Sequence, residues 1–409
     1  MAIHPTKPLT TPPDSPAAAV RAMIERIRAV DVQSVPLEHA TGRILAEDAT
    51  TDRPSPASDV SAMDGYALRR TDMHGTTAIP IAGELMIGRA PSSLPAGACL
   101  RIVTGAPVPQ EADAVVKRED VIESPEAIRF TPELAARIRA GENIRRRGDN
   151  GPPGTLIARA GARITPALAG ALATFGHADV RVHRPIRVAI ISTGDEVLDV
   201  RAMPTDWQLR DSNGPTLRAL VGSNAWAEVA MCERVGDDES LIRRTLAAAV
   251  ERCDAVLLSG GVSMGHRDFV PEAIGAIGGT VIYHKLPQRP GKPMLGAVVG
   301  DSKVIFGLPG NPMSVLVTAV RIALPVLRAL AGVASPIPDP RVVALADPDA
   351  KSVDLWWSRP VRLGEDGRAC IVAAQGSGDV VSIANSDGFV EFPPGASGPG
   401  PWPYYPWTG

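Results

Sequence analysis

Residues Ala255 to Val270 read AVLLSGGVSMGHRDFV, and this stretch decides the fold. A short apolar run, Val256 to Leu258, leads directly into the turn Ser259 to Gly261, and a helical pattern begins at Pro271. The pattern predicts a buried strand that opens into a tight loop before a helix. In open α/β sheets ligands bind at the carboxyl ends of strands, where loop N–H groups and helix N-termini can hold anions. A lone Gly-Gly turn is more often an ordinary connection, so the interpretation depends on the flanking segments.

The flanking segments repeat this alternation of apolar runs and loops. Further strands are expected at Val188 to Ile191, Glu228 to Val235, Thr280 to Tyr283 and Val304 to Phe306. Helices are expected to start at Asp211 to Pro215, to cover Asp237 to Cys253, and to run from Asn311 to about Ala331. Several strand–loop–helix units in succession predict a parallel, doubly wound α/β sheet. All strand ends should then lie at one edge, where the loops converge.

The composition is that of a globular chain with several domains. Its 409 residues suffice for about two to four domains, and a net charge of -3 does not indicate a nucleic-acid or membrane surface. No apolar run approaches the roughly 18 residues that span a bilayer. The N-terminal MAIHPTKPLTTPP has no apolar signal core, so we expect a cytoplasmic protein. Cys99, Cys232, Cys253 and Cys370 lack CxxC spacing, and we expect buried reduced thiols.

Four parts are expected along the chain. They are residues 1–60 with 141–184 (a linker and helical-β part), 61–140 (an inserted small β domain), 185–335 (the α/β domain) and 336–409 (a small C-terminal β domain). Ser15-Pro16 predicts the start of the first helix, with Ser as N-cap and Pro at the first helical position. The apolar stripe of that helix is Val20, Met23, Ile24, Ile27 and Val30. The sequence leaves open whether the aromatic end, PGPWPYYPWTG, packs or frays.

Charged residues gather in the loops that should converge at the edge of the sheet. Glu196 and Asp268 are carboxylates, and Lys285, Arg289 and Lys292 are cations. Carboxylates beside anion-binding backbone suit a hard divalent cation, Mg2+, shared with a phosphate. Three cations held together favour an anionic ligand over a purely structural role. The residues therefore predict phosphate-ester or oxyanion chemistry without identifying the substrate.

Turns in the first half of the chain supply further candidates. Asp64 precedes a glycine in SAMDGYA, and Thr104 follows an expected strand in RIVTGAPVP. Arg145 to Arg147 are three successive arginines in a turn-rich segment. An ordinary exposed turn or basic loop explains each of these about as well as a binding role does.

Taken together, these segments resemble the molybdopterin molybdenumtransferases, the family of MoeA and the gephyrin E domain. The matching motifs are SAMDGYA (61–67), RIVTGAPVP (101–109), GENIRRRG (141–148), STGDE (192–196), DSNGP (211–215), SGGVSMGHRDFV (259–270), RPGKP (289–293) and GLPGNPMS (307–314). The resemblance implies an elongated four-domain subunit whose central domain binds molybdopterin, and a homodimer with the active site between subunits. It also implies insertion of molybdate into adenylylated molybdopterin with release of AMP.

The resemblance further implies roles for individual residues. Asp64, Glu196 and Asp268 would be catalytic and would hold Mg2+. The substrate-binding residues would be Thr104, Thr193, Gly194, Ser212, Gly260, Gly261, Ser263, Lys285, Arg289, Lys292 and Ser377. Asp237, in a GDD segment, is a weaker match. Transient contact with the molybdopterin adenylyltransferase or with apo-molybdoenzymes is also implied, with no nucleic-acid partner and no membrane.

The chain departs from the family pattern at three places. Asn150 stands where an acidic residue is usual, with Asp149 one place earlier. The arginine expected in the last domain, ahead of an aromatic residue, has no clear counterpart between Asp354 and Arg359. The aromatic C-terminus replaces a valine-rich closing strand.

Three alternative functions stay open on the sequence. One is a molybdopterin adenylyltransferase, another a CinA-like nucleotide pyrophosphatase, and the third a catalytically degenerate scaffold or molybdopterin-binding protein of the same fold. The inserted β domain and the STGDE loop favour insertion over adenylylation, while SAMDGYA and GLPGNP argue against the pyrophosphatase. The departures from the family pattern favour the scaffold.

Overall fold

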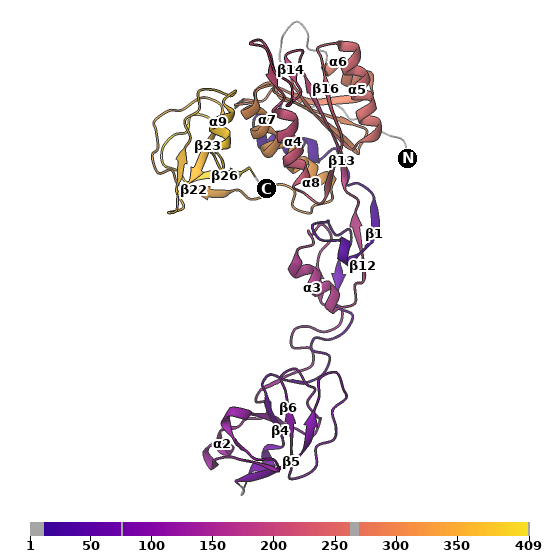
Figure 1. Ribbon diagram of the computed structural model, residues 1–409, viewed down its shortest axis with the longest axis vertical. Helices are drawn as coiled ribbons and strands as arrows, with labels where there is room; N and C mark the ends of the chain where they lie inside the picture. Colours follow the sequence, from indigo (N-terminus) through magenta and orange to yellow (C-terminus); the bar gives the residue numbers. More distant parts are fainter. Residues whose placement is uncertain (1–11, 75–76, 262–269, 408–409) are drawn as a thin grey trace. The chain divides into compact units, whose positions relative to one another are not determined.

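The computed structural model describes residues 12–74, 77–261 and 270–407 (Figure 1). These residues form two compact units, each built from separate stretches of the chain. Unit 1 contains residues 1–47, 159–170 and 177–409, and unit 2 contains residues 48–158 and 171–176.

A six-stranded sheet in the order β16-β13-β17-β21-β20-β18 forms the centre of unit 1. The strands are β13 (Ile186–Thr193), β16 (Ala227–Val235), β17 (Ala255–Ser259), β18 (Gly279–His284), β20 (Leu295–Val299) and β21 (Lys303–Leu308). Strands β16, β13, β17 and β21 are parallel, as the sequence predicts. The expectation that every strand ends at the same edge is wrong for β20, which is antiparallel to both neighbours. Because β20 reverses direction, β18 again runs with β21, and its carboxyl end returns to the shared edge.

Helices cover both faces of this sheet because alternate strand residues point to opposite sides. On one side Val188 and Ile190 pack with α1 (Pro16–Ile24), α4 (Asn213–Gly222), α7 (Pro312–Thr318) and α8 (Leu324–Leu330). On the other side Ala189 and Ile191 pack with α5 (Glu239–Arg252) and α6 (Val270–Ala276), and Figure 1 shows the two layers. Each large apolar side chain buried in this way contributes about 1.5–3 kcal/mol. The doubly wound fold class is therefore confirmed.

Helix α1 begins as predicted but ends early. The Ser15 hydroxyl accepts a hydrogen bond from the Ala18 N–H at 3.2 Å, and Pro16 occupies the first turn. The helix ends at Ile24, so Ile27 and Val30, expected on its stripe, lie beyond it. Val30 is nevertheless buried in the same core.

The long C-terminal helix of the α/β core contains a π-helical turn, η4 (Ala319–Ala323), between α7 and α8. Its span, Pro312–Leu330, is the one helix among the described residues that is long and apolar enough to cross a membrane. Within that span 89% of the apolar window is buried inside the protein. This burial is typical of a core helix of a globular domain.

A second sheet follows the α/β core, in the order β19-β23-β25-β26-β22, with β24 beside β23. Its elements are β19 (Gln288–Arg289), β22 (Arg341–Val343), β23 (Trp356–Leu363), β24 (Ala369–Ile371), β25 (Gly388–Phe392) and β26 (Trp402–Pro406), with helix α9 (Val380–Ala384) nearby. The aromatic end forms β26 and packs. The Tyr405 and Trp407 rings lie 5.1 and 5.4 Å from the Phe389 ring. The strand β26 therefore lies inside this sheet, between β25 and β22.

One buried ion pair joins the second sheet to the long helix. Arg321 in η4 donates from Nε and Nη2 to the Glu391 carboxylate on β25, at 2.8 and 3.0 Å. Arg321 is 7% exposed and Glu391 is 3% exposed. The guanidinium carbon also lies 4.8 Å from the centre of the Tyr405 ring. The charges thus have no access to water and depend on each other.

Unit 2 is dominated by a six-stranded sheet in the order β7-β4-β6-β5-β9-β8, which agrees with the expected small β domain. Its strands are β4 (Gly65–Leu68), β5 (Ala78–Leu85), β6 (Cys99–Ile102), β7 (Ala114–Lys117), β8 (Ile122–Glu123) and β9 (Ala127–Arg129). Helix α2 (Pro132–Arg137), capped by Thr131, was not expected from the sequence.

Short two-stranded sheets complete the described chain. They pair β1 (Val32–Pro36) with β12 (Asp179–His183), β2 (Ala49–Thr50) with β11 (Leu156–Ala158), β3 (Val60–Ser61) with β10 (Ile144–Arg145), and β14 (Val197–Leu198) with β15 (Leu209–Arg210). Among the described residues, the remaining α-helix is α3 (Pro166–Thr174), and the short 3-10 helices are η1 (Leu37–His39), η2 (Arg70–Met73) and η3 (Arg118–Asp120).

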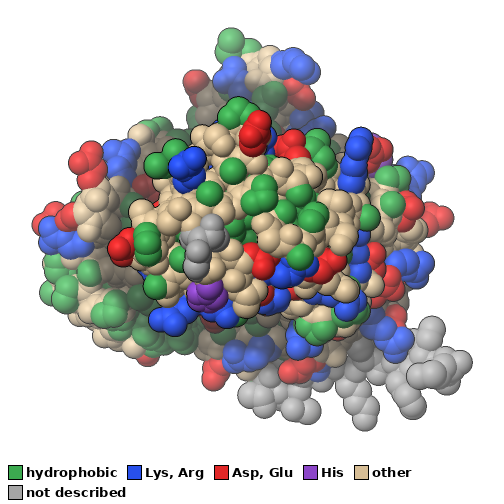
Figure 2. All heavy atoms as spheres, turned by 90° about the horizontal axis from the view of Figure 1, so that it is seen from below, with side chains coloured by type: hydrophobic (Ala, Val, Ile, Leu, Met, Phe, Trp, Pro, Cys, Tyr) green, Lys and Arg blue, Asp and Glu red, His purple; other side chains and the backbone are tan. Residues whose placement is uncertain are grey.

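The surface of the protein carries charges of both signs, and its cysteines differ in exposure. On the face drawn in Figure 2, acidic and basic side chains lie next to one another, so their fields largely compensate. All four cysteines are free, and Cys99 and Cys253 are buried as expected. The expectation of burial is wrong for Cys232 and Cys370, which are exposed.

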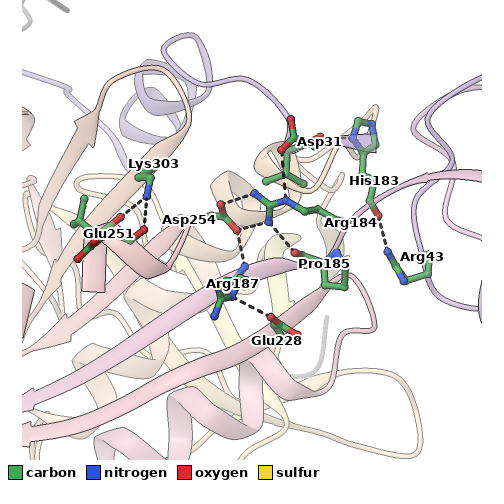
Figure 3. A network of polar contacts seen from close by, with 12 residues as sticks. Asp31, Arg43, His183, Arg184, Pro185, Arg187, Glu228, Glu251, Asp254 and Lys303 are labelled. Atoms are coloured by element: carbon green, nitrogen blue, oxygen red, sulfur yellow. Dashed lines mark hydrogen bonds and ion pairs between the residues drawn. The ribbon is translucent and has the colours of Figure 1, made fainter. Parts of the chain in front are cut away.

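A polar network holds the β12–β13 connection against the amino ends of the sheet strands (Figure 3). Arg184 makes a two-point contact with Asp254 at 2.7 and 2.8 Å, and the Arg187 N–H donates to the same carboxylate at 2.7 Å. Although burial opposes ionisation, these hydrogen bonds keep the pKa of Asp254 below its ordinary value. The carboxylate therefore stabilises the fold while it is ionised.

Asp254→Asn is expected to lower the free energy of unfolding by about 3 kcal/mol at neutral pH. Because the folded pKa of Asp254 is lowered, its contribution is complete above the unfolded pKa of about 3.9 and is lost as pH falls through the folded pKa. The difference between wild type and variant should therefore shrink below about pH 4. Urea unfolding across pH measures this. Asp301→Asn, which removes an exposed partner of Arg28, is the control and should cost less than about 1 kcal/mol.

Candidate active site

The loop after β13 brings a carboxylate to the carboxyl edge of the sheet. Gly194 has a φ of +133°, and its N–H donates to the Val235 carbonyl at 3.1 Å. The exposed Glu196 carboxylate lies against Gly194, where an added Cβ would stand 2.6 Å from Oε2. The φ value favours glycine here, and the missing Cβ lets the Glu196 carboxylate lie this close to the strand end. Asp237 is exposed, and its N–H donates to the neighbouring Asp195 carboxylate at 3.0 Å.

The glycine turn after β17 packs directly on the β13 loop. Gly260 and Gly261 have φ values of +88° and +66°, in the left-handed region that favours glycine. A Cβ at Gly260 would stand 2.6 Å from Thr193 Oγ1. Thr193 is itself buried and donates to the Ser259 carbonyl at 3.2 Å, so its hydroxyl supports the turn.

The start of α4 is the third component of the edge. The Gly214 N–H donates to Asp211 at 2.9 Å, and Asn213 Nδ2 donates to the Gly310 carbonyl at 2.8 Å. Ser212 stands at the N-cap position without a side-chain capping bond. The Asn213 contact ties the loop before α4 to the GLPGNP loop after β21.

Two buried serines beneath these loops were not predicted. Ser192 and Ser259 pair across β13 and β17, and both are 2% exposed. Within the described part of the chain neither hydroxyl oxygen has a hydrogen-bond partner, and the same holds for Asn213 Oδ1. Buried polar groups normally have partners, so these three atoms indicate a place for water or ligand under the edge. In the sequence, both serines stand at the ends of apolar strands, and that position could have indicated them.

The loop from Lys285 to Lys292 carries the predicted cations. Lys285 has a φ of +71°, a strained value for a non-glycine residue. The Leu286 N–H donates to the Lys292 carbonyl at 2.9 Å, and Gln288 Nε2 donates to the Gly291 carbonyl at 2.9 Å. These bonds close the loop on itself, and Arg289 and Lys292 remain exposed.

Strand β23 of the second sheet positions Arg289. Strand β19 pairs with β23 in parallel, and this pairing places Arg289 opposite Trp357. The Arg289 and Arg359 guanidinium carbons lie 5.6 and 4.5 Å from the centre of the Trp357 ring. Arg359 is held by Asp349 at 2.8 and 2.9 Å. In place of the arginine expected near Asp354, this chain therefore has two guanidinium groups stacked on one indole ring.

Ser377 reaches the same edge from the second sheet. Its hydroxyl oxygen accepts a hydrogen bond from Asn311 Nδ2 at 2.8 Å, and its carbonyl accepts from the Met313 N–H at 3.0 Å. Met313 lies in the first turn of α7, so Ser377 caps the helix that follows the GLPGNP loop. The Ser377 proton stays available for an acceptor on a ligand.

Asp64 and Thr104 lie together in unit 2. The Thr104 N–H and hydroxyl donate to one Asp64 carboxylate oxygen at 2.7 and 2.8 Å, and these bonds lower the pKa of Asp64. The pair lines a cavity of about 510 Å3 with Lys117, Arg118 and Glu119. Asp64 is exposed, so its charge faces the cavity and not the core.

In the loop that carries Asn150, the polar side chains hydrogen-bond to nearby residues. Asn150 accepts from Arg145 Nη2 at 2.8 Å and donates to Ser55 Oγ at 3.0 Å. The Asp149 carboxylate accepts from the Arg146 N–H at 2.7 Å. Both side chains shape the loop.

The predicted residues thus fall into two groups. Thr193, Gly194, Glu196, Ser212, Gly260, Gly261, Lys285, Arg289, Lys292 and Ser377 belong to unit 1, whereas Asp64 and Thr104 belong to unit 2. Ser263 and Asp268 lie outside the described residues. Within the described ranges no three carboxylate, histidine or cysteine side chains form a metal-binding group.

This combination defines a multidomain α/β protein with cations and glycine turns at one edge of its central sheet, and family comparisons agree with that fold class. Residues 15–176 match the model of the MoeA N-terminal region (domain I and II), and residues 189–329 match the probable molybdopterin binding domain. A molybdopterin molybdenumtransferase of Synechocystis is 33% identical over 360 residues, 86% of this chain and 88% of its own. That of Staphylococcus aureus is 30% identical over 389 residues, 93% of this chain and 91% of its own.

A solved structure of a molybdopterin biosynthesis MoeA protein from Pyrococcus horikoshii is 28% identical and has a TM-score of 0.76. It covers 96% of this chain and 99% of its own. The chain belongs to the molybdopterin molybdenumtransferase family of molybdenum cofactor biosynthesis. The match over residues 15–176 separates it from enzymes that share only the central domain.

Proposed function

We propose that this chain inserts molybdate into adenylylated molybdopterin and releases AMP, the last step in making the molybdenum cofactor. The observation that carries the proposal is the carboxyl edge of the unit 1 sheet. There the left-handed turn at Gly260 and the closed cationic loop Lys285 to Lys292 both pack on the loop after β21: a Cβ at Gly310 would stand 3.9 Å from Gly260 Cα, and a Cβ at Gly291 would stand 3.8 Å from Pro309. Full-length similarity to the molybdenumtransferases supports it.

Each element of the edge has a role in this reaction. Lys285, Arg289 and Lys292 bind the anionic groups and lower the repulsion between molybdate and the substrate phosphates. The glycine turn leaves room for phosphate oxygens close to the backbone. Ser377 donates its remaining proton to an oxyanion. Water supplies the oxygen that bonds to phosphorus as the phosphoanhydride breaks, so that one phosphate leaves with AMP and the other stays on the pterin.

Mg2+ is proposed as the metal of the site. The exposed Glu196 carboxylate is a hard oxygen donor at the strand end, and Asp64 is a second exposed carboxylate with a lowered pKa. With Asp268 they would hold the ion, which would polarise the phosphoanhydride. A magnesium titration of AMP release, with Asp268→Asn shifting the requirement upward, tests this role.

We propose a homodimer whose active site lies between subunits, because the candidate residues divide between unit 1 and unit 2. Multi-angle light scattering at micromolar concentration should give about twice the 42.9 kDa of one chain. A monomer at that concentration would contradict the proposal. Two-fold contacts are the usual arrangement for such dimers.

The decisive experiment is an assay of AMP release from adenylylated molybdopterin, with and without molybdate. Molybdate-dependent release is expected. Binding of the pterin without release would favour the alternative of a catalytically degenerate scaffold, which the replacement of the expected arginine supports.

We further propose a cytoplasmic location, since free cysteines suit a reducing compartment. We also propose transient contact with the adenylyltransferase or with apo-molybdoenzymes.

Lys292→Ala is expected to weaken binding of adenylylated molybdopterin at least tenfold, with little change in stability. Lys292 is exposed, and surface substitutions usually shift stability by about 0.5 kcal/mol or less. Calorimetry measures the affinity, and thermal unfolding measures the stability. Lys351→Ala, an exposed lysine of the second sheet's domain, is the control and should bind normally. Equal affinity of both variants would remove Lys292 from the site.

A further inference from the structure

A second cavity of unit 2, distinct from the one beside Asp64, has an unusual charge. Its volume is about 840 Å3, and it is lined by Arg53, Arg89, Arg146 and Arg147. The one carboxylate in its lining is Asp59. Four guanidinium groups against one carboxylate leave an excess of three positive charges.

Asp59 is already fully engaged by its own loop. One oxygen accepts from Arg146 Nη1 at 2.6 Å, and the other accepts from the Arg147 N–H at 2.8 Å. Although burial opposes it, these bonds keep the pKa of Asp59 below its ordinary value. Among the described residues, the guanidinium groups of Arg53, Arg89 and Arg147 have no carboxylate partner. All four arginines are exposed, so water screens much of their mutual repulsion, and an anion bound among them would remove the rest.

The backbone on both sides of Asp59 is tied down, so Arg146 and Arg147 project from a fixed frame. The Val108 N–H donates to the Asp59 carbonyl at 2.9 Å, and Val60 bridges to Pro107. On the other side Val60 pairs with Arg145 in the β3–β10 ribbon. The Gly148 N–H also donates to the Pro56 carbonyl at 3.0 Å. A fixed frame lowers the entropy that a ligand must overcome on binding.

We propose that this cavity binds a tetrahedral oxyanion, as free molybdate or as the phosphate group of a nucleotide. Guanidinium groups present paired N–H donors that match the oxygens of such anions. Walls that include Pro91, Pro107 and Pro109 leave room for an organic group beyond the anion. Gly105 lines the cavity and follows Thr104 directly in the sequence, so one segment of the chain contributes to this cavity and to the Asp64–Thr104 pair. Binding here does not depend on the proposed activity and is measured without turnover.

Equilibrium dialysis of the full-length protein tests the proposal, with molybdate, inorganic phosphate and AMP as three separate probes. All measurements use the Lys292→Ala background, so that binding at the unit 1 edge is weakened in every sample. The test variant is Arg89→Gln with Arg147→Gln, which removes two charges. Arg89→Lys keeps the charge and loses the paired donors. The control is Arg129→Gln, an exposed arginine of β9 outside the cavity.

At least one probe is expected to bind with a stoichiometry of one per chain. The double variant should lose tenfold or more of that affinity, Arg89→Lys should lose part of it, and the control should keep it. Tighter binding of molybdate identifies the free oxyanion, and tighter binding of AMP identifies the nucleotide phosphate. Equal losses of affinity in the double variant and the control would show that only the overall charge of the protein matters, and would overturn the proposal. Absence of saturable binding would overturn it as well, whatever the outcome of the AMP-release assay. If the double variant fails to fold, Arg53→Gln replaces it.

Discussion

Asp64→Asn is expected to lower the rate of molybdate-dependent AMP release by roughly a hundredfold or more, with almost no change in melting temperature. The asparagine oxygen can still accept from the Thr104 N–H and hydroxyl, so the geometry of the pair is retained. What disappears is a fully exposed negative charge whose pKa is lowered by those same bonds. An exposed charge contributes little to folding, so the loss should fall on turnover.

Thr104 provides the matched control for this experiment. Thr104→Ser keeps both donors to Asp64 and should retain most of the activity, whereas Thr104→Val removes the hydroxyl donor and should lose part of it. Steady-state kinetics separate an effect on kcat from an effect on KM. Near-normal turnover of Asp64→Asn would show that the carboxylate only shapes its turn.

Glu391→Gln is expected to lower the free energy of unfolding by about 3–5 kcal/mol, because it leaves the buried Arg321 charge without its counter-charge. The same change should loosen the second sheet, since Arg321 links the long helix to β25. Urea unfolding followed by tryptophan fluorescence measures both effects, because Trp402 and Trp407 pack within that sheet.

Two further variants test whether the unpaired buried charge causes this loss of stability. Replacing both partners, Arg321→Met with Glu391→Met, removes both charges and should recover much of the lost stability. Glu239→Gln breaks the exposed pair with Arg243 on α5 and should cost less than about 1 kcal/mol. Equal costs for the buried and the exposed pair would show that burial does not decide the strength of the Arg321 contact.

The strands of the α/β core could be predicted because both faces are buried. Val188 to Ile191 and Val256 to Leu258 are therefore continuously apolar, and they are β13 and β17 in the structure. Strand β20, Leu295–Val299, was missed because it follows the RPGKP loop closely and contains Gly296. Helix α2 was missed because six residues are too few to show helical periodicity.

The candidate site was predictable where the fold itself brings residues together. Parallel strands share an edge, so Glu196 and the turn at Gly260 could be expected there before any distance was known. The stacking of Arg289 on Trp357 joins residues far apart in the chain, and neither periodicity nor spacing indicates it. The hydrogen bond from Asn311 to Ser377 likewise joins residues far apart in the chain.

The discontinuous build of unit 1 imposes an order on folding during synthesis. Helix α1 buries Ala19, Val20 and Met23 against elements that include α8, which is made about 300 residues later. At about 5–20 residues per second, the ribosome needs roughly 15–60 s to supply that partner. Unit 2, residues 48–158 with 171–176, is complete long before then and can fold first. Until α8 is made, the apolar face of α1 has no partner to pack against. During this interval, in which unit 2 can already be folded, the nascent chain is most accessible to chaperones and most prone to aggregation.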